Sequence, residues 1–224
     1  MVKQDLYNKS PVRLFDAATE GGLKEGGLGL VTSKKGLGKT SVLVQFGMDT
    51  LLKDEQLVHV TFDLHSSNVI SWYDGIFAEI AKKSAGNSAE LKTDVVSKRT
   101  ILNFSLDNFS VTKVVNTLKA LSAAGIAVKG VVMDGIDFTK VSEDDVKAVA
   151  DYAQSEKVTV WTSATSEGAK LADVVPANLE KYFDVVINLA QTGSNVAVDV
   201  LKLGDKKDVE SGLKLDSKTL LISK

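Results

Sequence analysis

The stretch that decides the fold reads Ser33-Lys34-Lys35-Gly36-Leu37-Gly38-Lys39-Thr40. The apolar run at 29–32 before it is typical of a buried strand, and the run at 41–52 after it carries apolar residues at helical spacing. A glycine-rich turn between a strand and a helix is the context in which backbone amides cradle phosphate groups. We therefore expect a phosphate-binding loop whose ligand is a nucleoside triphosphate.

Each part of this loop has a chemical role. Gly36 and Gly38 let the backbone turn its amides toward the phosphates, and the helix that follows adds its dipole. Lys39 reaches the outer phosphates, and the hydroxyl of Thr40 is a ligand for Mg2+. The motif G-x-x-x-x-G-K-[ST] expects a glycine where this chain has Ser33, whose small side chain is compatible with the first turn. The expected nucleotide contacts are Ser33, Lys34, Lys35, Gly36, Leu37, Gly38, Lys39, Thr40 and Ser41. The alternative is a surface turn that binds nothing.

The composition limits the class of protein. A chain of 224 residues encloses a full core, so we expect one α/β domain over residues 1–224. It has 27 lysines and arginines against 29 acidic residues, a formal charge of -2 that does not favour nucleic acid as the main partner. The absence of cysteine excludes disulfides and fits a cytoplasmic protein, and no apolar run predicts a signal peptide or a membrane span.

Apolar, β-branched runs alternate with helical patterns, which predicts a mostly parallel central sheet with helices on both faces. The strands are expected at 29–32, 57–63, 101–106, 131–134, 158–163 and 184–189. Ser110 and Ser142 are placed to cap the helices after them. The spacer at 191–194 predicts an antiparallel hairpin with 195–203 at the sheet edge, and 219–223 a short final strand. The polar stretch at 82–98 has little strand character and is expected to contain a mobile connection.

Asp134 ends the apolar strand at 131–133, where a carboxylate projects toward the ligand side of a parallel sheet and can hold Mg2+. The alternative role is a strand-terminal Asp that hydrogen-bonds the turn at Gly135. Asp137 is either a further site acid or a solvated loop acid. His59 is expected to face a packing layer, and His65 lies in a loop beyond Asp63.

The segment that leads into the loop carries a more specific signal. Residues Arg13-Leu14-Phe15-Asp16 and 21–30, with their paired and spaced glycines, resemble the segment before the first strand of the RecA-like ATPases of the KaiC, RadA and DnaB group. In that group a GG-hydrophobic-x-x-G segment stands there. The resemblance implies a RecA-like P-loop NTPase domain that binds ATP and Mg2+, with an antiparallel C-terminal edge and identical subunits as partners.

The resemblance also implies roles for residues beyond the loop. Asp63 matches the acid that polarises the attacking water, which is usually glutamate in the family, or it caps the segment at 66–68 instead. Thr162 and Ser163 end the strand that resembles the family's sensor strand, where a hydroxyl contacts the outer phosphate or the water. The alternative for both is a satisfied core hydroxyl.

Two lysines invite further comparison. Lys202 matches a position from which relatives project a basic residue into the neighbouring subunit, but its usual basic companion is Gly204 here, which favours a solvated edge-strand lysine. Lys34 resembles the early lysine of the deviant loop in the MinD and ParA ATPases, yet Lys35 stands where their glycine does. Both loop lysines are interpreted as positive potential around phosphate.

These observations predict an Mg-ATP-binding, RecA/KaiC-like protein with weak or regulatory hydrolysis coupled to self-assembly or signalling. One alternative is a non-catalytic interaction scaffold with a degenerate nucleotide site, favoured by Ser33, Asp63 and Gly204. Another is an accessory ATPase of DNA repair or recombination, which would need a local basic patch.

Overall fold

The computed structural model describes residues 3–62, 66–82, 88–105 and 110–224. In these ranges the helices are α1 (Lys3–Asn8), α2 (Val12–Ala18), α3 (Lys39–Leu52), α4 (Ser66–Ala81), α5 (Ser88–Val96), α6 (Val111–Ala123), α7 (Glu143–Glu156), α8 (Leu171–Val174) and the 3-10 turn η2 (Glu180–Tyr182). The strands are β1 (Leu28–Ser33), β2 (Gln56–Phe62), β3 (Arg99–Phe104), β4 (Val128–Ile136), β5 (Thr159–Thr165), β6 (Val185–Thr192), β7 (Asn195–Leu203), β8 (Lys206–Leu215) and β9 (Ile222–Ser223).

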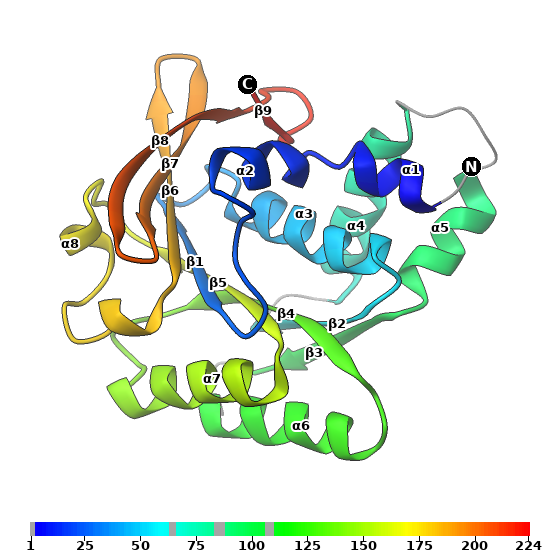
Figure 1. Cartoon of the computed structure of the whole chain (residues 1–224), viewed down its shortest axis with the longest axis horizontal. Coiled ribbons are helices and arrows are strands. Elements are labelled where there is room, and N and C mark those ends of the chain that lie inside the picture. Colours follow the sequence, from blue (N-terminus) through cyan, green and yellow to red (C-terminus); the bar gives the residue numbers. More distant parts are fainter. Residues whose placement is uncertain (1–2, 63–65, 83–87, 106–109) are drawn as a thin grey trace.

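One sheet runs through the molecule in the order β3-β2-β4-β5-β1-β6-β7-β8-β9. The strands from β3 to β6 are parallel to their neighbours, and β6 to β9 form an antiparallel series. Helices α1 to α4 cover one face and α6 and α7 the other (Figure 1). The predicted fold class, a mostly parallel sheet between helices with an antiparallel C-terminal edge, is confirmed.

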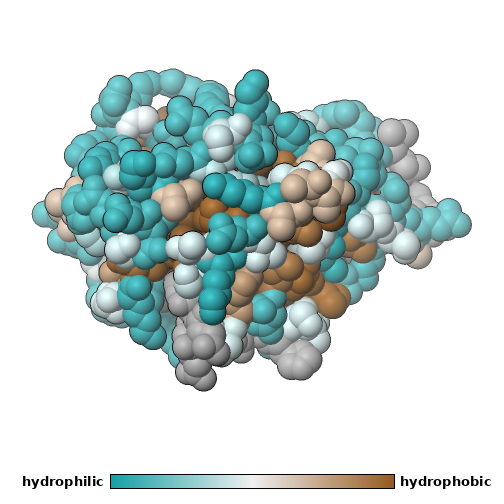
Figure 2. Space-filling model, turned by 90° about the horizontal axis from the view of Figure 1, so that it is seen from below, coloured by the Kyte–Doolittle hydropathy of each residue, from teal (hydrophilic) through white to brown (hydrophobic). Residues whose placement is uncertain are grey.

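The alternation of each strand sends side chains into two separate apolar cores. On the α3 side, Val31, Val132 and Trp161 pack with the buried residues of α3 and α4. On the α6 and α7 side, Leu30, Met133 and Val160 pack with the apolar stripes of those two helices. Apolar surface remains visible among the polar side chains when the molecule is seen from the side of α6 and α7 (Figure 2). The face of the sheet on which a strand residue lies therefore decides whether it packs in the core under α3 or in the core under α6 and α7.

Of the two serines predicted to cap helices, one makes the capping hydrogen bond and the other does not. Ser142 caps α7 as predicted, because its hydroxyl accepts from the Asp145 amide while the Asp145 side chain accepts from the Ser142 amide. Ser110 occupies the N-cap position of α6 but makes no capping bond with its side chain. No described helix has both the length and the apolar character needed to cross a bilayer.

The structure adds to or departs from the sequence expectations in three places. The stretch at 82–98 contains the helix α5, and residues 83–87 of the expected connection lie outside the described residues. The hairpin of β6 and β7 is present, but β8 and β9 continue the sheet beyond it, so β7 is not an edge strand. Lys206 and Lys207 begin β8, a strand that the sequence patterns had not indicated. The alternation in β8 is hard to recognise because most of its residues are polar and exposed.

Candidate functional site

The loop at 34–38 joins the carboxyl end of β1 to the start of α3. Gly36 and Gly38 have φ angles of 88° and 104°, a left-handed conformation that favours glycine. Ser33 is the last, buried residue of β1 and has no left-handed φ, so the fold does not require the glycine that the motif expects there. The backbone amides of the first turn of α3 are left without helical partners, as at any helix start. The loop therefore has the backbone of an anion site.

Lys39 lies across this loop. Its Nζ donates to the carbonyl oxygens of Ser33, at 3.1 Å, and Lys34, at 3.3 Å, and to the Ser33 hydroxyl at 3.2 Å. Burial lowers the pKa of Lys39, and the carboxylate of Asp134 opposes that shift. An ammonium group held by neutral oxygens has no bound counter-charge in the loop itself. A phosphate group can supply one.

Asp134 lies beside the start of α3, although β5 separates its strand from β1. Its Oδ2 accepts from the Thr40 hydroxyl at 2.7 Å, and its Oδ1 accepts from the Ser163 hydroxyl at 2.6 Å. The Gly135 amide donates to the Ser163 oxygen at 2.9 Å. Asp134 is only 7 % exposed. Three residues from three elements are thus joined around one carboxylate at the edge of the loop.

The two candidate hydroxyls of β5 have different positions. Ser163 lies on the α3 face with Asp134. Thr162 points to the opposite face, where its hydroxyl donates to the Gly29 carbonyl at 3.0 Å and its side chain lies among residues under α7. The expectation that Thr162 contacts the nucleotide is therefore not supported by its position, and its satisfied core hydroxyl matches the alternative. Consecutive strand residues cannot both face one site.

The remaining loop residues lie where the motif places them. Lys34 and Lys35 are exposed, and Lys34 pairs with Glu167 at 3.2 Å. Leu37 is half-buried against the α3 core. Ser41 is fully buried, and its hydroxyl donates to the Leu220 carbonyl at 3.0 Å, so only its backbone is available to a ligand.

Gln45, one turn further along α3, continues this contact. Its Nε2 donates to the Leu220 carbonyl at 3.0 Å, and its Oε1 accepts from the Ile222 amide at 2.9 Å. The loop helix is thereby bonded to the segment that enters β9. No sequence pattern had indicated this contact, because the partners are 177 residues apart.

Several sequence candidates lie away from the site or outside the described residues. Asp63 and His65 are outside the described ranges. Asp137 is exposed and accepts from the Thr139 amide and hydroxyl, which lower its pKa, so it is the loop acid of the second interpretation. His59 is buried in a packing layer as expected.

Lys202 is neither solvated nor on an edge strand, so that expectation was wrong. Its Nζ donates to the carbonyl oxygens of Glu180, at 2.8 Å, and Phe183, at 2.6 Å. These carbonyls belong to η2 and the residue after it, which are thereby fastened to β7. Two of the three donors of Lys202 are thus used inside its own chain, which directs the side chain toward η2.

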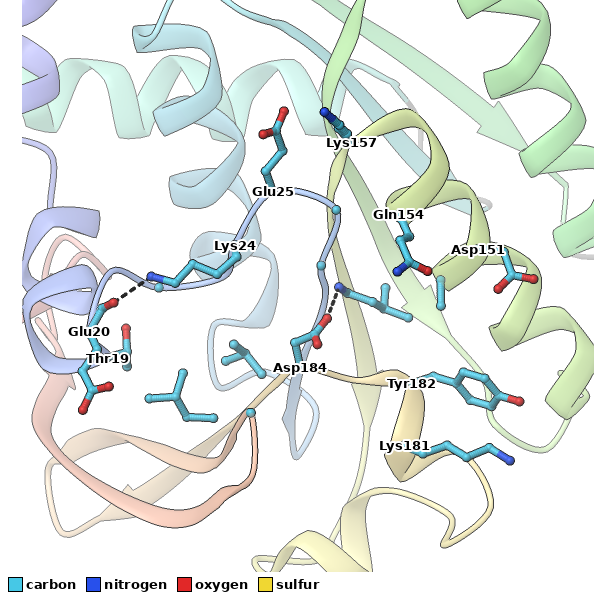
Figure 3. A pocket seen from close by; sticks show the side chains of 18 residues that line it. Thr19, Glu20, Lys24, Glu25, Asp151, Gln154, Lys157, Lys181, Tyr182 and Asp184 are labelled. Carbon is cyan, nitrogen blue, oxygen red and sulfur yellow. Dashed lines mark hydrogen bonds between the residues drawn. The ribbon is translucent and has the colours of Figure 1, made fainter.

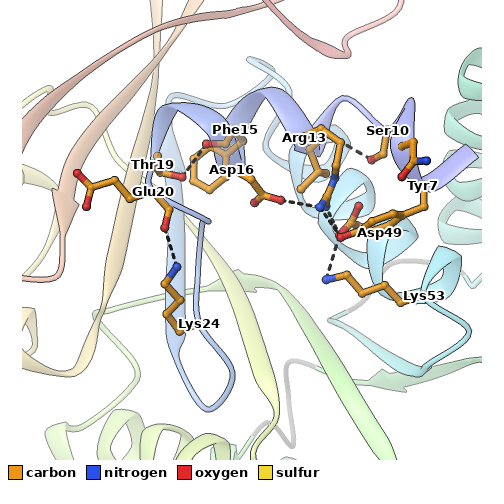
Figure 4. A network of polar contacts seen from close by, with 12 residues as sticks. Tyr7, Ser10, Arg13, Phe15, Asp16, Thr19, Glu20, Lys24, Asp49 and Lys53 are labelled. Carbon is orange, nitrogen blue, oxygen red and sulfur yellow. Dashed lines mark hydrogen bonds and ion pairs between the residues drawn. The ribbon is translucent and has the colours of Figure 1, made fainter. Parts of the chain in front are cut away.

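Both arginines of the chain serve as structural residues. Arg13 of α2 contacts the Tyr7 ring and hydroxyl and pairs with Asp16 at 2.8 Å and Asp49 at 2.6 Å (Figure 4). Arg99 is half-buried, with its guanidinium 4.7 Å from the ring centroid of Tyr73. Each lies near the amino ends of the parallel strands, whereas the loop lies at their carboxyl ends. The positive charge at the loop is therefore supplied by lysines.

A large cavity of about 730 Å3 also lies at the amino end of the sheet, where β1 and β6 begin. Asp184 stands in it and accepts from the Leu28 amide at 2.9 Å, while Lys24 donates to the Glu20 carbonyl (Figure 3). The loop and this cavity thus lie at opposite ends of the parallel strands.

The loop, the carboxylate on β4 and the polar hydroxyl on the strand between them define the nucleotide site of a RecA-like P-loop domain. A family model described as "ATPase: KaiC" matches residues 9–158, which is more than half of the chain. The chain therefore belongs to the KaiC ATPase family. None of the curated proteins matches it. Ser163 and Lys202 lie beyond the matched residues.

Proposed function

We propose that this protein binds ATP with Mg2+ and hydrolyses it slowly, as a switch coupled to self-assembly or signalling. The observation that carries the proposal is the carboxylate of Asp134, which accepts from both Thr40 and Ser163 beside the phosphate loop. The loop amides and Lys39 would bind the phosphates. We take the whole chain as one nucleotide-binding unit that works in the cytoplasm.

The residues present fit a magnesium ion. Thr40 and Asp134 offer a hydroxyl and a carboxylate 2.7 Å apart, and Mg2+ prefers oxygen ligands of this kind together with substrate phosphates. When bound, the ion would neutralise charge on the outer phosphates. Ser163 would hold the carboxylate in place and sense the outer phosphate.

Slow hydrolysis follows from the catalytic groups that the chain offers. Asp63 is the proposed acceptor for the proton of the attacking water, and its side chain is one methylene shorter than the family's glutamate. Transition-state charge in phosphoryl transfer is often met by an arginine, but both arginines here are held at the other end of the sheet. In this proposal the cation would be a lysine from a second copy of the chain, because the arginines of that copy are held in the same way.

Calorimetric titration with ATP tests the binding step. Wild type should bind ATP more tightly with Mg2+ than with EDTA, and Asp134→Asn should lose that difference while it still binds ATP without metal. Lys147→Ala, which removes an exposed lysine from the far face, is the matched control and should bind like wild type. Absence of ATP binding by wild type at millimolar concentration would reject the proposal in favour of a scaffold.

Phosphate release tests the enzymatic step. Asp63→Ala should abolish the slow release, and Asp63→Glu, which restores the family's longer acid, should increase it. Sedimentation with and without ATP, in the same buffer, tests whether nucleotide and assembly are linked. Release that is equal in wild type and Asp63→Ala would remove Asp63 from the mechanism and leave a binding switch.

A further inference from the structure

Two polar side chains of β2 lie buried under α3 and α4. His59 and Thr61 are both fully buried. The Nδ1 of His59 lies 3.0 Å from the Tyr73 hydroxyl of α4. The Nε2 of His59 and the Oγ1 of Thr61 have no protein partner. One strand therefore presents two open hydrogen-bonding atoms to the same layer.

The strand register brings this pair to Asp134. Thr61 pairs with Asp134 and His59 with Val132 in the parallel ladder of β2 and β4. Paired residues of neighbouring strands project to the same face, and Val132 belongs to the α3 core, as do the neighbours of His59 on α4. Thr61 thus lies alongside the carboxylate, on the side away from Ser163.

Packing holds the Tyr73 hydroxyl in place against His59. A Cβ at Gly47 of α3 would stand 2.3 Å from the Tyr73 hydroxyl, so the helix backbone closes directly over the tyrosine. Tyr73 is thereby held on Nδ1 of the imidazole. A buried polar atom without a hydrogen bond is costly, and two such atoms beside a carboxylate meet the requirement of an internal water for two to four polar partners.

We propose that Thr61 and His59 are positioning residues for Asp134, which they support through a buried water shared with its carboxylate. The imidazole Nε2 donates to the water when the Tyr73 hydroxyl donates to Nδ1. The Thr61 hydroxyl also donates to this water, and the water donates to the carboxylate on the side opposite the bond from Ser163. This inference rests on the proposed function only in so far as Asp134 is the magnesium ligand.

Thr61→Val tests the proposal, because valine keeps the shape of threonine and removes only the hydroxyl. If the hydroxyl is part of a satisfied network, the variant without nucleotide should melt about 2–4 °C below wild type. The Mg2+ concentration needed for half-maximal enhancement of ATP binding should rise about tenfold, since outer-shell partners tune metal affinity by that order. ATP affinity in EDTA should stay unchanged, and Thr61→Ser should restore both properties.

Two outcomes would overturn the proposal. A higher melting temperature for Thr61→Val would mean that the hydroxyl has no partner and that its burial only costs stability. An unchanged Mg2+ requirement, in a wild-type protein that does bind Mg-ATP, would mean that Thr61 does not position the carboxylate.

The proposed function can fail separately. If wild type binds no ATP, the magnesium measurement gives no signal, and the nitrogen-15 NMR spectrum of His59 decides instead. A slowly exchanging Nε2 proton that loses its protection in Thr61→Val, together with the lower melting temperature, would support the shared water. Fast exchange in wild type would reject it.

Discussion

The two ends of α3 are both rich in charge, but they use it differently. At the amino end, Lys39 is held only by neutral oxygens of the loop, and Thr40 meets a carboxylate from another strand. At the carboxyl end, Asp49 is 4 % exposed and pairs with Arg13 at 2.6 Å and Lys53 at 3.3 Å. Among the described residues, the cation at the amino end forms no direct ion pair and has Asp134 only as a more distant counter-charge, whereas the charges at the carboxyl end are paired directly.

This difference shows that charge content does not identify the site. The Arg13 cluster, which consists of Arg13, Asp16, Asp49 and Lys53, joins α2 to the helix that carries the loop, and its charges are paired with one another (Figure 4). The loop differs because its left-handed glycines turn backbone amides outward, where a phosphate can accept from them. The comparison implies that the amino end of α3 serves ligand binding and the carboxyl end serves stability. The following predictions test this division and the layers around it.

The largest expected effect is at the amino end. Lys39→Ala should weaken ATP binding at least 100-fold, about 3 kcal/mol or more, because a charge-assisted contact to phosphate is lost. Its melting temperature should stay near that of wild type. Arg13→Ala should keep ATP affinity within about twofold when it is folded. Equal losses of affinity in the two variants, measured by titration below their melting temperatures, would contradict the comparison.

The buried layer under α3 that contains His59 should make the free energy of unfolding depend on pH. Burial lowers the pKa of His59 to about 4, against the favourable charge of Asp134, while Arg99 lowers it further. Unfolded His59 takes up its proton near pH 6.5, so stability is intact above that pH and falls as pH drops toward 4, by roughly 3 kcal/mol in total. Urea unfolding from pH 7 to pH 4.5 measures this loss.

His59→Gln provides the reference for that series, since carboxylates also lose stabilising charge in acid. The difference between wild type and the variant should shrink as the pH falls below 6.5. A difference that is constant with pH would mean that the imidazole is not buried in its neutral form.

A smaller effect is expected at the carboxyl end of α3. Arg13→Ala should lower the free energy of unfolding by about 2 kcal/mol, because Asp49 stays buried with only Lys53 as partner. Lys147→Ala removes an exposed pair at 2.7 Å on α7 and should cost no more than about 0.5 kcal/mol. If chemical denaturation shows similar losses of unfolding free energy for Arg13→Ala and Lys147→Ala, the Arg13 cluster stabilises the protein no more than an exposed ion pair does.

The smallest effect concerns a lysine remote from both ends. Lys202→Ala removes two donors to backbone carbonyls and should cost about 1 kcal/mol of stability, with ATP binding and phosphate release unchanged. Measuring phosphate release across a range of protein concentrations sharpens the test. A loss of activity confined to high concentration would show that Lys202 acts on a neighbouring copy after all.

Local chemistry made much of the fold and the loop predictable. The glycines at 36 and 38, the alternation of strands with helices and the Ser142 cap each depend on a few adjacent residues. Asp134 was found because it follows an apolar strand. Such features can be recognised without knowledge of which strands are neighbours.

Features that depend on which strands are neighbours, or on which face of the sheet a residue lies, could not be predicted from adjacent residues. The position of β5 between β1 and β4 brings Ser163 to Asp134, and strand alternation sends Thr162 to the other face. The contacts of Lys202 depend on η2, which has no strong sequence signal. The strand β8 was missed because polar residues dominate it.

The bond between Gln45 and Ile222 links parts of the chain that are 177 residues apart. Closing a loop of that length costs conformational entropy before the contact contributes any stabilisation. We therefore expect such pairings to form late in folding. The first turns of α3 can become helical early from local interactions, but their attachment to the sheet beyond β7 has to wait for β8 and β9. We therefore expect the phosphate loop to gain this support late in folding, so that a partly folded chain would have the loop sequence without the contacts that hold its helix.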